Sequence, residues 1–570
     1  MKSDHKKDIL NAAQLLVLLL GALFISLLEG CNRNTENKGE ERDALMSYRS
    51  ISFHKEPDSS LIKLAAEIGF NDICYQVEGN TLEKLQEIRR TEDSKGYMEI
   101  AHKRGMTISI WMREISNYDP DWGPVSMDND IFWNRTAEKY DRIFTELVPE
   151  VDHIIFTVVE SQVNIADSPA ILERMVKLVN DKCREYGKQL VLRTFVHLPH
   201  ELDSLERKVS TLPDDIIIMS KYVESDWNLL GPDHRMIGRT GEKKQFVELD
   251  ITGEYFRVTY VPNCFTANLE RRFEYWREQG VDGISVRVSR DPRPGAWWEP
   301  LQFAHNVYAE PNEVNLWALG YMALGKADPV EQAWIDFTHT YFNDSIADRV
   351  ISILEPQGAI LAEALNTGAQ PFGCGRLLIP GEWTMNGQHC ACADTIAVKY
   401  DDDDDMLYRN PFYHKYSPHV WHPELAEQYH RIRKGDPEVI RQKEQSTRQM
   451  LQLADSLLGE FGKLKGKMDD KTYRYYLFKL EENRWHLEVM KHWQLAWLKA
   501  SNLLYFDSDK SIGRKEILHH LEELSRLSEQ QDNRLTMQWY GKDVDIGKGE
   551  YLDIQGYTRM FRKYWAEVLS

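Results

Sequence analysis

One stretch decides the fold, and it reads HIIFTVVESQVNIADSPAILERMVKLVNDKCREYGKQLVLRTFVH from His153 to His197. It opens with β-branched and apolar residues that end at Glu160, which predicts a strand over residues 153–160. Helical periodicity then covers residues 168–187 and ends at Gly187, because glycine takes the left-handed conformation that closes a helix. A second strand is predicted over residues 189–197. Strand, helix and strand in this order indicate a parallel sheet.

The same alternation continues on both sides of this stretch. Further strands are predicted at residues 50–54, 72–78, 107–113, 215–222, 245–251 and 282–289. With the first two they make eight, the number of βα units in a (β/α)8 TIM barrel. The last barrel helix is predicted over residues 313–325. We therefore predict an α/β fold whose barrel spans residues 47–327.

Beyond the barrel the strand signal ends and long helical patterns follow. The clearest ones cover residues 436–463, 470–502 and 512–531. They predict an α-helical C-terminal domain over residues 328–570. Within it, residues 370–422 form a long irregular loop rich in Gly, Pro, His and Tyr, and loops of this length are usually functional or disordered.

The N-terminus has the pattern of an export signal. Basic residues precede an apolar run at 15–28, and Leu28, Glu29, Gly30 and Cys31 resemble the cleavage site of a bacterial lipoprotein, at which the cysteine is acylated. This predicts a signal peptide over residues 1–30 and a polar tether over 31–46. The protein would be lipid-anchored in the cell envelope, at the periplasmic face or the cell surface. Because Glu29 replaces the usual small residue, an uncleaved anchor or an ordinary signal peptide stays open.

Composition excludes some partners and site types. The chain carries 70 Lys and Arg against 90 Asp and Glu, a net charge of −20, so it would repel nucleic acid. Seven cysteines are an odd number and too dilute for a disulfide scaffold. The set Cys374, His389, Cys390 and Cys392 lacks the spacing of a zinc site, so no metal is predicted. The sequence does not indicate an oligomeric state.

Charged residues cluster where a barrel carries its active site, at the carboxyl ends of the strands. Glu160 follows a buried run, and burial raises the pKa of a carboxyl group, which suits a general acid that still holds its proton. Arg193 lies on strand five and Lys221 on strand six. Asp226 follows strand six and Glu254 follows strand seven, which gives two candidate bases.

Each of these residues also has a structural interpretation. A charged residue at a strand end is more often a loop salt bridge than a catalyst, and Glu224, Glu248 and Asp250 are nearby alternatives for the carboxylates. Trp111 and Trp227 lie at or beyond strand ends, where an indole can stack on a sugar, but core packing explains a tryptophan about as often. Function is favoured because an acid, two bases and two cations fall on consecutive strands.

Four of these segments resemble the catalytic core of the glycoside hydrolase family 67 α-glucuronidases. They are FTVVESQ at 156–162, LRTFV at 192–196, KY at 221–222 with Asp226, and DITGEY at 250–255. The segment NEVNLWALGYMA at 312–323 also resembles that family's last barrel helix. The resemblance covers roughly residues 47–344. Two features depart from the family: the β-rich domain that usually precedes the barrel is replaced by the tether, and Val158 stands where the family has an acidic residue.

The resemblance implies a role for each matched residue. Glu160 would be the general acid, Asp226 and Glu254 would activate water, and Arg193 with Lys221 would lie near the carboxylate of a uronic acid. It also implies an inverting mechanism without a metal or an organic cofactor.

We therefore expect an exo-acting α-glucuronidase that releases (4-O-methyl-)glucuronic acid from xylan-type oligosaccharides. The alternatives are a glycosidase of different uronide or sugar specificity, and a non-catalytic glycan-binding lipoprotein. The presence of all three carboxylates argues against the last alternative.

Overall fold

The computed structural model describes residues 44–569, apart from residues 54–58, 78–91, 114–119, 158–167, 197, 225–227, 252–260, 289–310, 373–383, 386–387, 390–416, 507–508, 533–535, 540–541 and 546–553. The predicted signal peptide and the proposed lipidation site Cys31 lie outside these residues.

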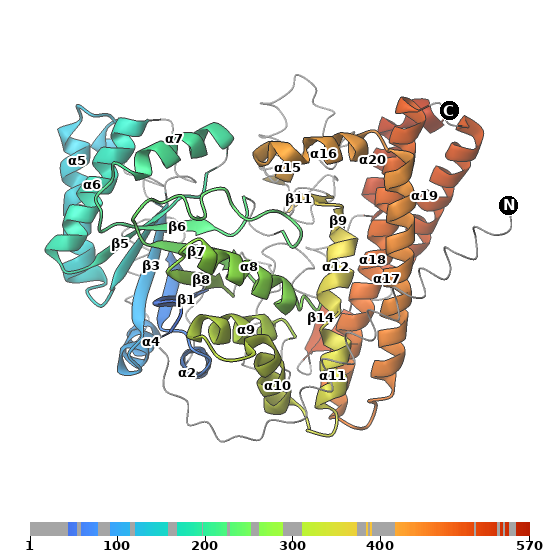
Figure 1. Ribbon diagram of the computed structural model, residues 1–570, viewed down its shortest axis with the longest axis horizontal. Helices are drawn as coiled ribbons and strands as arrows, with labels where there is room; N and C mark the ends of the chain where they lie inside the picture. The colour runs from blue at the N-terminus through green and yellow to red at the C-terminus, as the bar shows by residue number, and fades with distance from the viewer. Residues whose placement is uncertain are drawn as a thin grey trace. The chain divides into compact units, whose positions relative to one another are not determined.

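Eight parallel strands form a closed barrel in chain order, as the TIM-barrel prediction requires (Figure 1). The strands are β1 (Tyr48–Phe53), β2 (Asp72–Val77), β3 (Thr107–Arg113), β4 (His153–Thr157), β5 (Gln189–Arg193), β6 (Ile217–Lys221), β7 (Gln245–Asp250) and β8 (Gly283–Arg287). Strand β8 closes the barrel by pairing with β1, with Ser285 opposite Ser50. Every predicted strand is confirmed, and each begins within two residues of its predicted start.

Helices follow most of the strands. In the described residues they are α2 (Ser59–Glu67), α4 (Glu92–Lys103), α5 (Asp130–Arg142), α6 (Pro169–Glu185), α7 (Pro199–Val209), α8 (Thr266–Glu278) and α9 (Glu313–Leu324). Helix α9 ends as predicted at Gly325, whose φ of 73° is the left-handed conformation. A π-helical turn, Ile143–Leu147, continues α5 directly.

The connection from β6 to β7 departs from the repeating pattern. Its described residues, 222–224 and 228–244, contain turns and no helix. Gly238 and Gly241 have φ values of 75° and 68° there, and Pro232 follows Gly231. These residues interrupt a helix because they require or impose other backbone conformations.

The barrel interior is polar at its floor and apolar in its middle. At the floor, Asp72 accepts hydrogen bonds from the hydroxyls of Tyr48 (2.9 Å), Ser50 (2.6 Å), Thr107 (2.6 Å) and Ser109 (2.8 Å). Above the floor, a second group of side chains from the strands forms an apolar layer that includes Cys74, Ile155, Val191, Met219 and Phe246. Charged side chains are therefore confined to the two ends of the barrel.

The chain after the barrel is mainly helical, as predicted. Its helices are α10 (Pro329–Tyr341), α11 (Ala347–Leu354), α12 (Gln357–Leu365), α15 (Pro418–Trp421), α16 (Ala426–Arg433), α17 (Pro437–Gly462), α18 (Asp470–Tyr505), α19 (Lys510–Asp532), α20 (Ile554–Tyr564) and α21 (Ala566–Leu569). Helix α18 packs against both α17 and α19 (Figure 1). It buries side chains all around its axis, among them Trp485, Trp493 and Trp497, which is typical of a helix inside a bundle.

Three short antiparallel sheets correct the expectation that strands end before residue 328. They pair β9 (Asn366–Thr367) with β10 (Gln370–Pro371), β11 (Thr384–Met385) with β12 (Gln388–His389), and β13 (Thr536–Trp539) with β14 (Lys542–Asp545). Strands of two to four residues are too short to show alternating hydrophobicity, so the sequence pattern misses them.

The barrel and the helical region belong to one compact unit, Ala44–Ser570. The Nε1 of Trp334 on α10 donates to Thr266 on α8 at 3.1 Å, which ties the two regions together. The domain boundary at residue 328 stays a prediction. Among the described helices, none is both long enough and apolar enough to cross a membrane.

Candidate active site

Charged side chains close the carboxyl end of half of the barrel. The last residues of β5, β6, β7 and β8 are Arg193, Lys221, Asp250 and Arg287, and Glu248 lies two residues earlier on β7. We call these five residues the mouth cluster. All five are at most 4% exposed, so their charges interact in a medium less polar than water.

Arg193 and Glu248 form a bidentate ion pair inside the barrel. Nε of Arg193 donates to Oε2 of Glu248, and Nη2 donates to Oε1 at 3.0 Å. Nη1 donates to the hydroxyl of Thr157, the last residue of β4, at 3.1 Å. Because β6 separates β5 from β7, the pair links two strands that are not neighbours in the barrel. The guanidinium is therefore held at all three nitrogens.

Lys221 and Arg287 complete the charge pattern around β7. Nζ of Lys221 lies 3.9 Å from Oε1 of Glu248 and 3.8 Å from Oδ2 of Asp250. Nε of Arg287 lies 3.2 Å from Oδ1 of Asp250, and its Nη1 lies 3.9 Å from Oε1 of Glu248. Each carboxylate is thus shared between cations from neighbouring strands.

Aromatic rings from β3 and from beyond β5 contact the same cations. The Cζ of Arg193 lies 4.5 Å from the ring centroid of Trp111, and the Cζ of Arg287 lies 5.3 Å from it. Phe195 lies 4.8 Å from the Cζ of Arg193 and 4.9 Å from Nζ of Lys221. These are cation–π distances. Trp111 is 6% exposed, and its predicted sugar-stacking role stays a prediction.

The mouth cluster holds three cations and two carboxylates, so its described side chains sum to +1. Burial opposes ionisation of Glu248, but the charges of Arg193, Lys221 and Arg287 outweigh burial and lower its pKa to about 2. Glu248 is therefore ionised at neutral pH and is unsuited to act as a general acid.

The predicted catalytic residues lie just beyond the described strand ends. Glu160, Asp226 with Trp227, and Glu254 are outside the residues that the structure describes, and their roles stay predictions. Glu160 follows the end of β4, at Thr157, by three residues. Asp226 follows the end of β6 by five residues, and Glu254 follows the end of β7 by four.

Of the predicted binding residues, Arg193 and Lys221 do lie together at this end of the barrel. The structure adds Arg287, which sequence reasoning missed, and gives Glu248 a definite partner. The sequence signal for Arg287 is its position on β8, two residues after Ser285 and four after Gly283, which places it on the same inward face of the strand. A charged side chain on that face requires a partner.

A second buried charge pair lies next to the mouth, between the barrel and the helical region. Glu224, three residues beyond β6, accepts a hydrogen bond at Oε1 from Nε2 of His422 at 3.0 Å and from the backbone N–H of Arg235 at 3.1 Å. Burial opposes ionisation of Glu224, but the hydrogen bond and the charge of His422, together with the backbone N–H of Arg235, lower its pKa. Sequence reasoning missed His422 because 198 residues separate it from Glu224.

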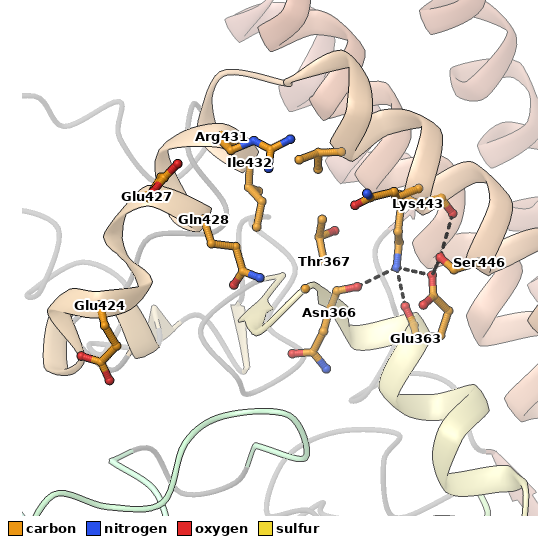
Figure 2. Close-up of a pocket in the computed structure, with 13 residues that line it drawn as sticks. Glu363, Asn366, Thr367, Glu424, Glu427, Gln428, Arg431, Ile432, Lys443 and Ser446 are labelled. Carbon is orange, nitrogen blue, oxygen red and sulfur yellow. Dashed lines mark hydrogen bonds and ion pairs between the residues drawn. The ribbon is translucent and has the colours of Figure 1, made fainter.

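A pocket of about 430 Å³ lies apart from the mouth cluster, among α12, β9, α16 and α17 (Figure 2). Its buried cation, Lys443, has no capacity left for a ligand. Nζ donates to the carbonyl oxygens of Glu363 (2.5 Å) and Asn366 (2.6 Å) and lies 2.8 Å from Oε1 of Glu363, which uses all three of its protons. We interpret Lys443 as a structural tie between α17 and α12.

The described residues contain no group of three or more His, Cys, Asp or Glu side chains placed to hold a metal ion. Three members of the set that the sequence analysis rejected as a zinc site, Cys374, Cys390 and Cys392, lie outside the described residues.

Comparisons with known proteins give only distant similarities. No protein-family model matches the chain, and no curated protein matches it. Similar solved structures are glycoside hydrolases. An O-GlcNAc hydrolase mutant of Thermobaculum terrenum is 11% identical over 92% of this chain and 94% of its own, with a TM-score of 0.41. CpGH84B is 11% identical over 92% of this chain and 77% of its own, with a TM-score of 0.42.

A third solved structure is BtGH115A, described as a family GH115 4-O-methyl-α-glucuronidase with specificity for decorated arabinogalactans. It is 13% identical over 92% of this chain and 62% of its own, with a TM-score of 0.43. With identities and TM-scores this low, none of the three identifies the family, substrate or reaction of this chain.

Proposed function

We propose that the protein is a glycoside hydrolase that acts on an oligosaccharide bearing a uronic acid, and specifically an exo-acting, inverting α-glucuronidase. The observation that carries this proposal is the mouth cluster. Three buried cations and two carboxylates lie at the end of the barrel where TIM-barrel enzymes bind their substrates. Arginine and lysine side chains at this end of a barrel can bind the carboxylate of a uronic acid through charge-assisted hydrogen bonds.

The cations support both parts of the proposed chemistry. They attract the carboxylate of a uronic acid, and they stabilise the ionised form of carboxylates that follow the same strands. Arg193 is engaged by Glu248 at two nitrogens, so we assign it to holding Glu248 and supplying charge. Lys221 is a buried cation at the last position of β6, and we assign it to the uronate, as the sequence resemblance implies.

The reaction that fits this assignment uses two carboxyl groups. Glu160 protonates the glycosidic oxygen, while Asp226 or Glu254 removes a proton from the water that attacks the opposite face of the anomeric carbon. An inverting enzyme holds the acid and the base about 6.5–9.5 Å apart so that the water fits between them. In the barrel, β5 separates β4 from β6, and β5 and β6 separate β4 from β7, so the ends of these strands are far enough apart for such a gap.

Two matched aryl glycosides test the proposal, the 4-nitrophenyl α-glucuronide and α-glucoside. Each charge-assisted hydrogen bond to the carboxylate is worth about 1.5–3 kcal/mol, so the uronide should react at least ~10-fold faster in kcat/KM. The variant Lys221→Met should remove most of this preference. Lys177→Met, on the exposed face of α6, is the control and should leave the preference unchanged.

Three results would redirect the proposal. Equal hydrolysis of both glycosides would favour a glycosidase of broader specificity. Retained anomeric configuration in the released sugar, observed by NMR, would exclude inversion. Binding of aldouronic oligosaccharides without hydrolysis, observed by calorimetry, would favour the glycan-binding alternative.

We also propose that Cys31 carries a lipid that anchors the protein in the bacterial cell envelope. The support for this part is the sequence pattern alone. Metabolic labelling with a fatty-acid analogue should mark the wild-type protein and leave Cys31→Ala unlabelled. Labelling of both proteins would contradict the assignment, and protease treatment of intact cells would distinguish the cell surface from the periplasmic face.

A further inference from the structure

The chain that leaves β6 is fastened at several points. The backbone N–H of Tyr222 donates to the carbonyl of Glu248 at 2.8 Å, and its carbonyl accepts from the N–H of His234 at 2.9 Å. Its hydroxyl accepts from the N–H of Asn228 at 2.9 Å. The amide of Asn228 in turn accepts from the N–H groups of Leu230 and Gly231. Tyr222 and Asn228 therefore fix the described chain at the two ends of the stretch from 222 to 228.

Glu224 lies between these two ends, and its carboxylate is bound from outside the barrel. His422 begins the 3-10 turn Pro423–Leu425 that precedes α16, and its Nε2 lies 3.0 Å from Oε1 of Glu224. The pair is buried, with Glu224 4% and His422 8% exposed. It is a direct polar contact from the helical region to the strand exit that precedes a predicted catalytic carboxylate.

The surroundings of His422 favour its charged form. Its second ring nitrogen, Nδ1, lies 3.4 Å from Oε1 of Glu424, so each nitrogen faces a carboxylate. Only the doubly protonated imidazolium donates at both nitrogens. Among the described residues, the other charged or titratable groups near this contact are His234, Arg235 and Lys221, all on the barrel side of Glu224.

The pKa values agree with this geometry. Burial lowers the pKa of His422, but the hydrogen bond and the charge of Glu224 outweigh burial, so its pKa is raised above the ordinary value. Burial lowers the pKa of His234 to about 4, and its Nδ1 accepts the N–H of Met236 at 3.1 Å, so His234 is neutral at physiological pH. The contact then contains one imidazolium beside the buried Glu224 carboxylate.

We propose that His422 is a positioning residue for catalysis: through Glu224 it fixes the exit of β6, the strand that ends at Lys221 and that the predicted base Asp226 follows in the sequence. This inference depends on the proposed function for the role of Asp226. The helical region thereby supports the exit of a barrel strand through a buried polar contact. His422 acts as a cation, so the positioning weakens when the pH rises through its raised pKa.

The first experiment measures kinetics of the full-length protein with the aryl α-glucuronide. His422→Ala should lower kcat by ~10- to 100-fold and change KM little, because a displaced catalytic group affects the chemical step more than binding. His422→Gln can still donate to Glu224, so it should recover most of the activity and lose the decline on the alkaline side of the pH profile. His430→Gln, an exposed histidine on α16, is the matched control and should behave as wild type.

The second experiment needs no substrate. Hydrogen–deuterium exchange of the peptide over residues 222–231 should be faster in His422→Ala than in wild type, and near wild type in His422→Gln. Unchanged exchange in His422→Ala would overturn the proposal, as would equal loss of activity in the Ala and Gln variants. If the wild type cleaves no uronide but the exchange changes as expected, the positioning holds and the proposed function fails.

Discussion

Replacing Glu248 by glutamine should destabilise the protein by about 3–4 kcal/mol at pH 7. The cations of the mouth cluster lower the pKa of Glu248 from 4.5 to about 2, and each pKa unit corresponds to about 1.36 kcal/mol, which gives roughly 3.4 kcal/mol. Breaking a buried ion pair on one side costs about 3–5 kcal/mol by a separate line of reasoning. For 570 residues, an unfolding entropy of about 2.1 cal/mol/K per residue converts this loss to a Tm decrease of roughly 3 °C.

The pH dependence makes the test specific to charge. Because the pKa of Glu248 is lower in the folded state, its ionisation stabilises the protein above pH 4.5, and this stabilisation is lost as the pH falls toward 2. The difference between wild type and Glu248→Gln should shrink to about 1.4 kcal/mol at pH 3. Denaturant unfolding at several pH values measures it.

Two comparisons isolate the ion pair. Glu274→Gln, at an exposed position of α8, should stay within about 0.5 kcal/mol of wild type. A double-mutant cycle with Arg193→Met should show that the two substitutions are not additive, because the side chains are in direct contact. A cost below about 1 kcal/mol, or a cost that does not change with pH, would refute the assignment of Glu248 as an ionised partner of three buried cations.

Three further predictions concern packing, acid stability and the general acid. Gly358→Ala should destabilise the protein by about 1–3 kcal/mol, because the added Cβ would lie 2.2 Å from the carbonyl oxygen of Cys264. Gly459→Ala, at an open position of α17, should instead stabilise the protein by about 0.5–1 kcal/mol. Thermal unfolding of the two variants compares these effects. Burial lowers the pKa of His492 to about 3 and that of His520 to about 2, so the unfolded chain takes up more protons than the folded protein below pH 6.5. As the pH decreases, the free energy of unfolding therefore decreases by up to about 1.4 kcal/mol per pH unit for each histidine. Replacing both histidines by glutamine should make Tm depend less on pH between pH 6 and 4. An unchanged dependence of Tm on pH would contradict this. Glu160→Gln should reduce hydrolysis of natural oligosaccharides by ~10² to 10⁴ and of aryl glycosides less, and equal losses would exclude it as the acid.

The barrel was predictable because each of its strands is buried on both faces. Such strands appear as short continuous runs of β-branched and apolar residues, and helices of a different period separate them. Charges inside such runs stand out for the same reason, so Arg193 and Lys221 were recognisable from the sequence. The structure places both in the mouth cluster, with Arg193 held by Glu248.

Features that depend on distant contacts were not predictable. The pairing of Glu224 with His422 joins positions 198 residues apart, and nothing local marks His422 as a partner for a carboxylate. Arg287 was overlooked because one charge on the last strand is common, and its meaning depends on Asp250 from β7. Glu248 was regarded as an alternative to the catalytic carboxylates, and only its contacts with three cations show that it is held ionised.

The distribution of charge inside the barrel bears on why the mouth cluster exists. At the floor, one carboxylate, Asp72, is satisfied by four neutral hydroxyls, and the middle layer is apolar. A barrel interior can therefore be filled in this sequence without buried cations. Buried ion pairs often stabilise a protein no better than apolar side chains of similar volume, so stability alone does not account for three cations at the mouth. Cations at the carboxyl end of a barrel do suit a site that binds a carboxylate and keeps a catalytic base ionised. This distribution and the sequence resemblance, which share Arg193 and Lys221, are the grounds on which we propose an anionic glycan as the substrate.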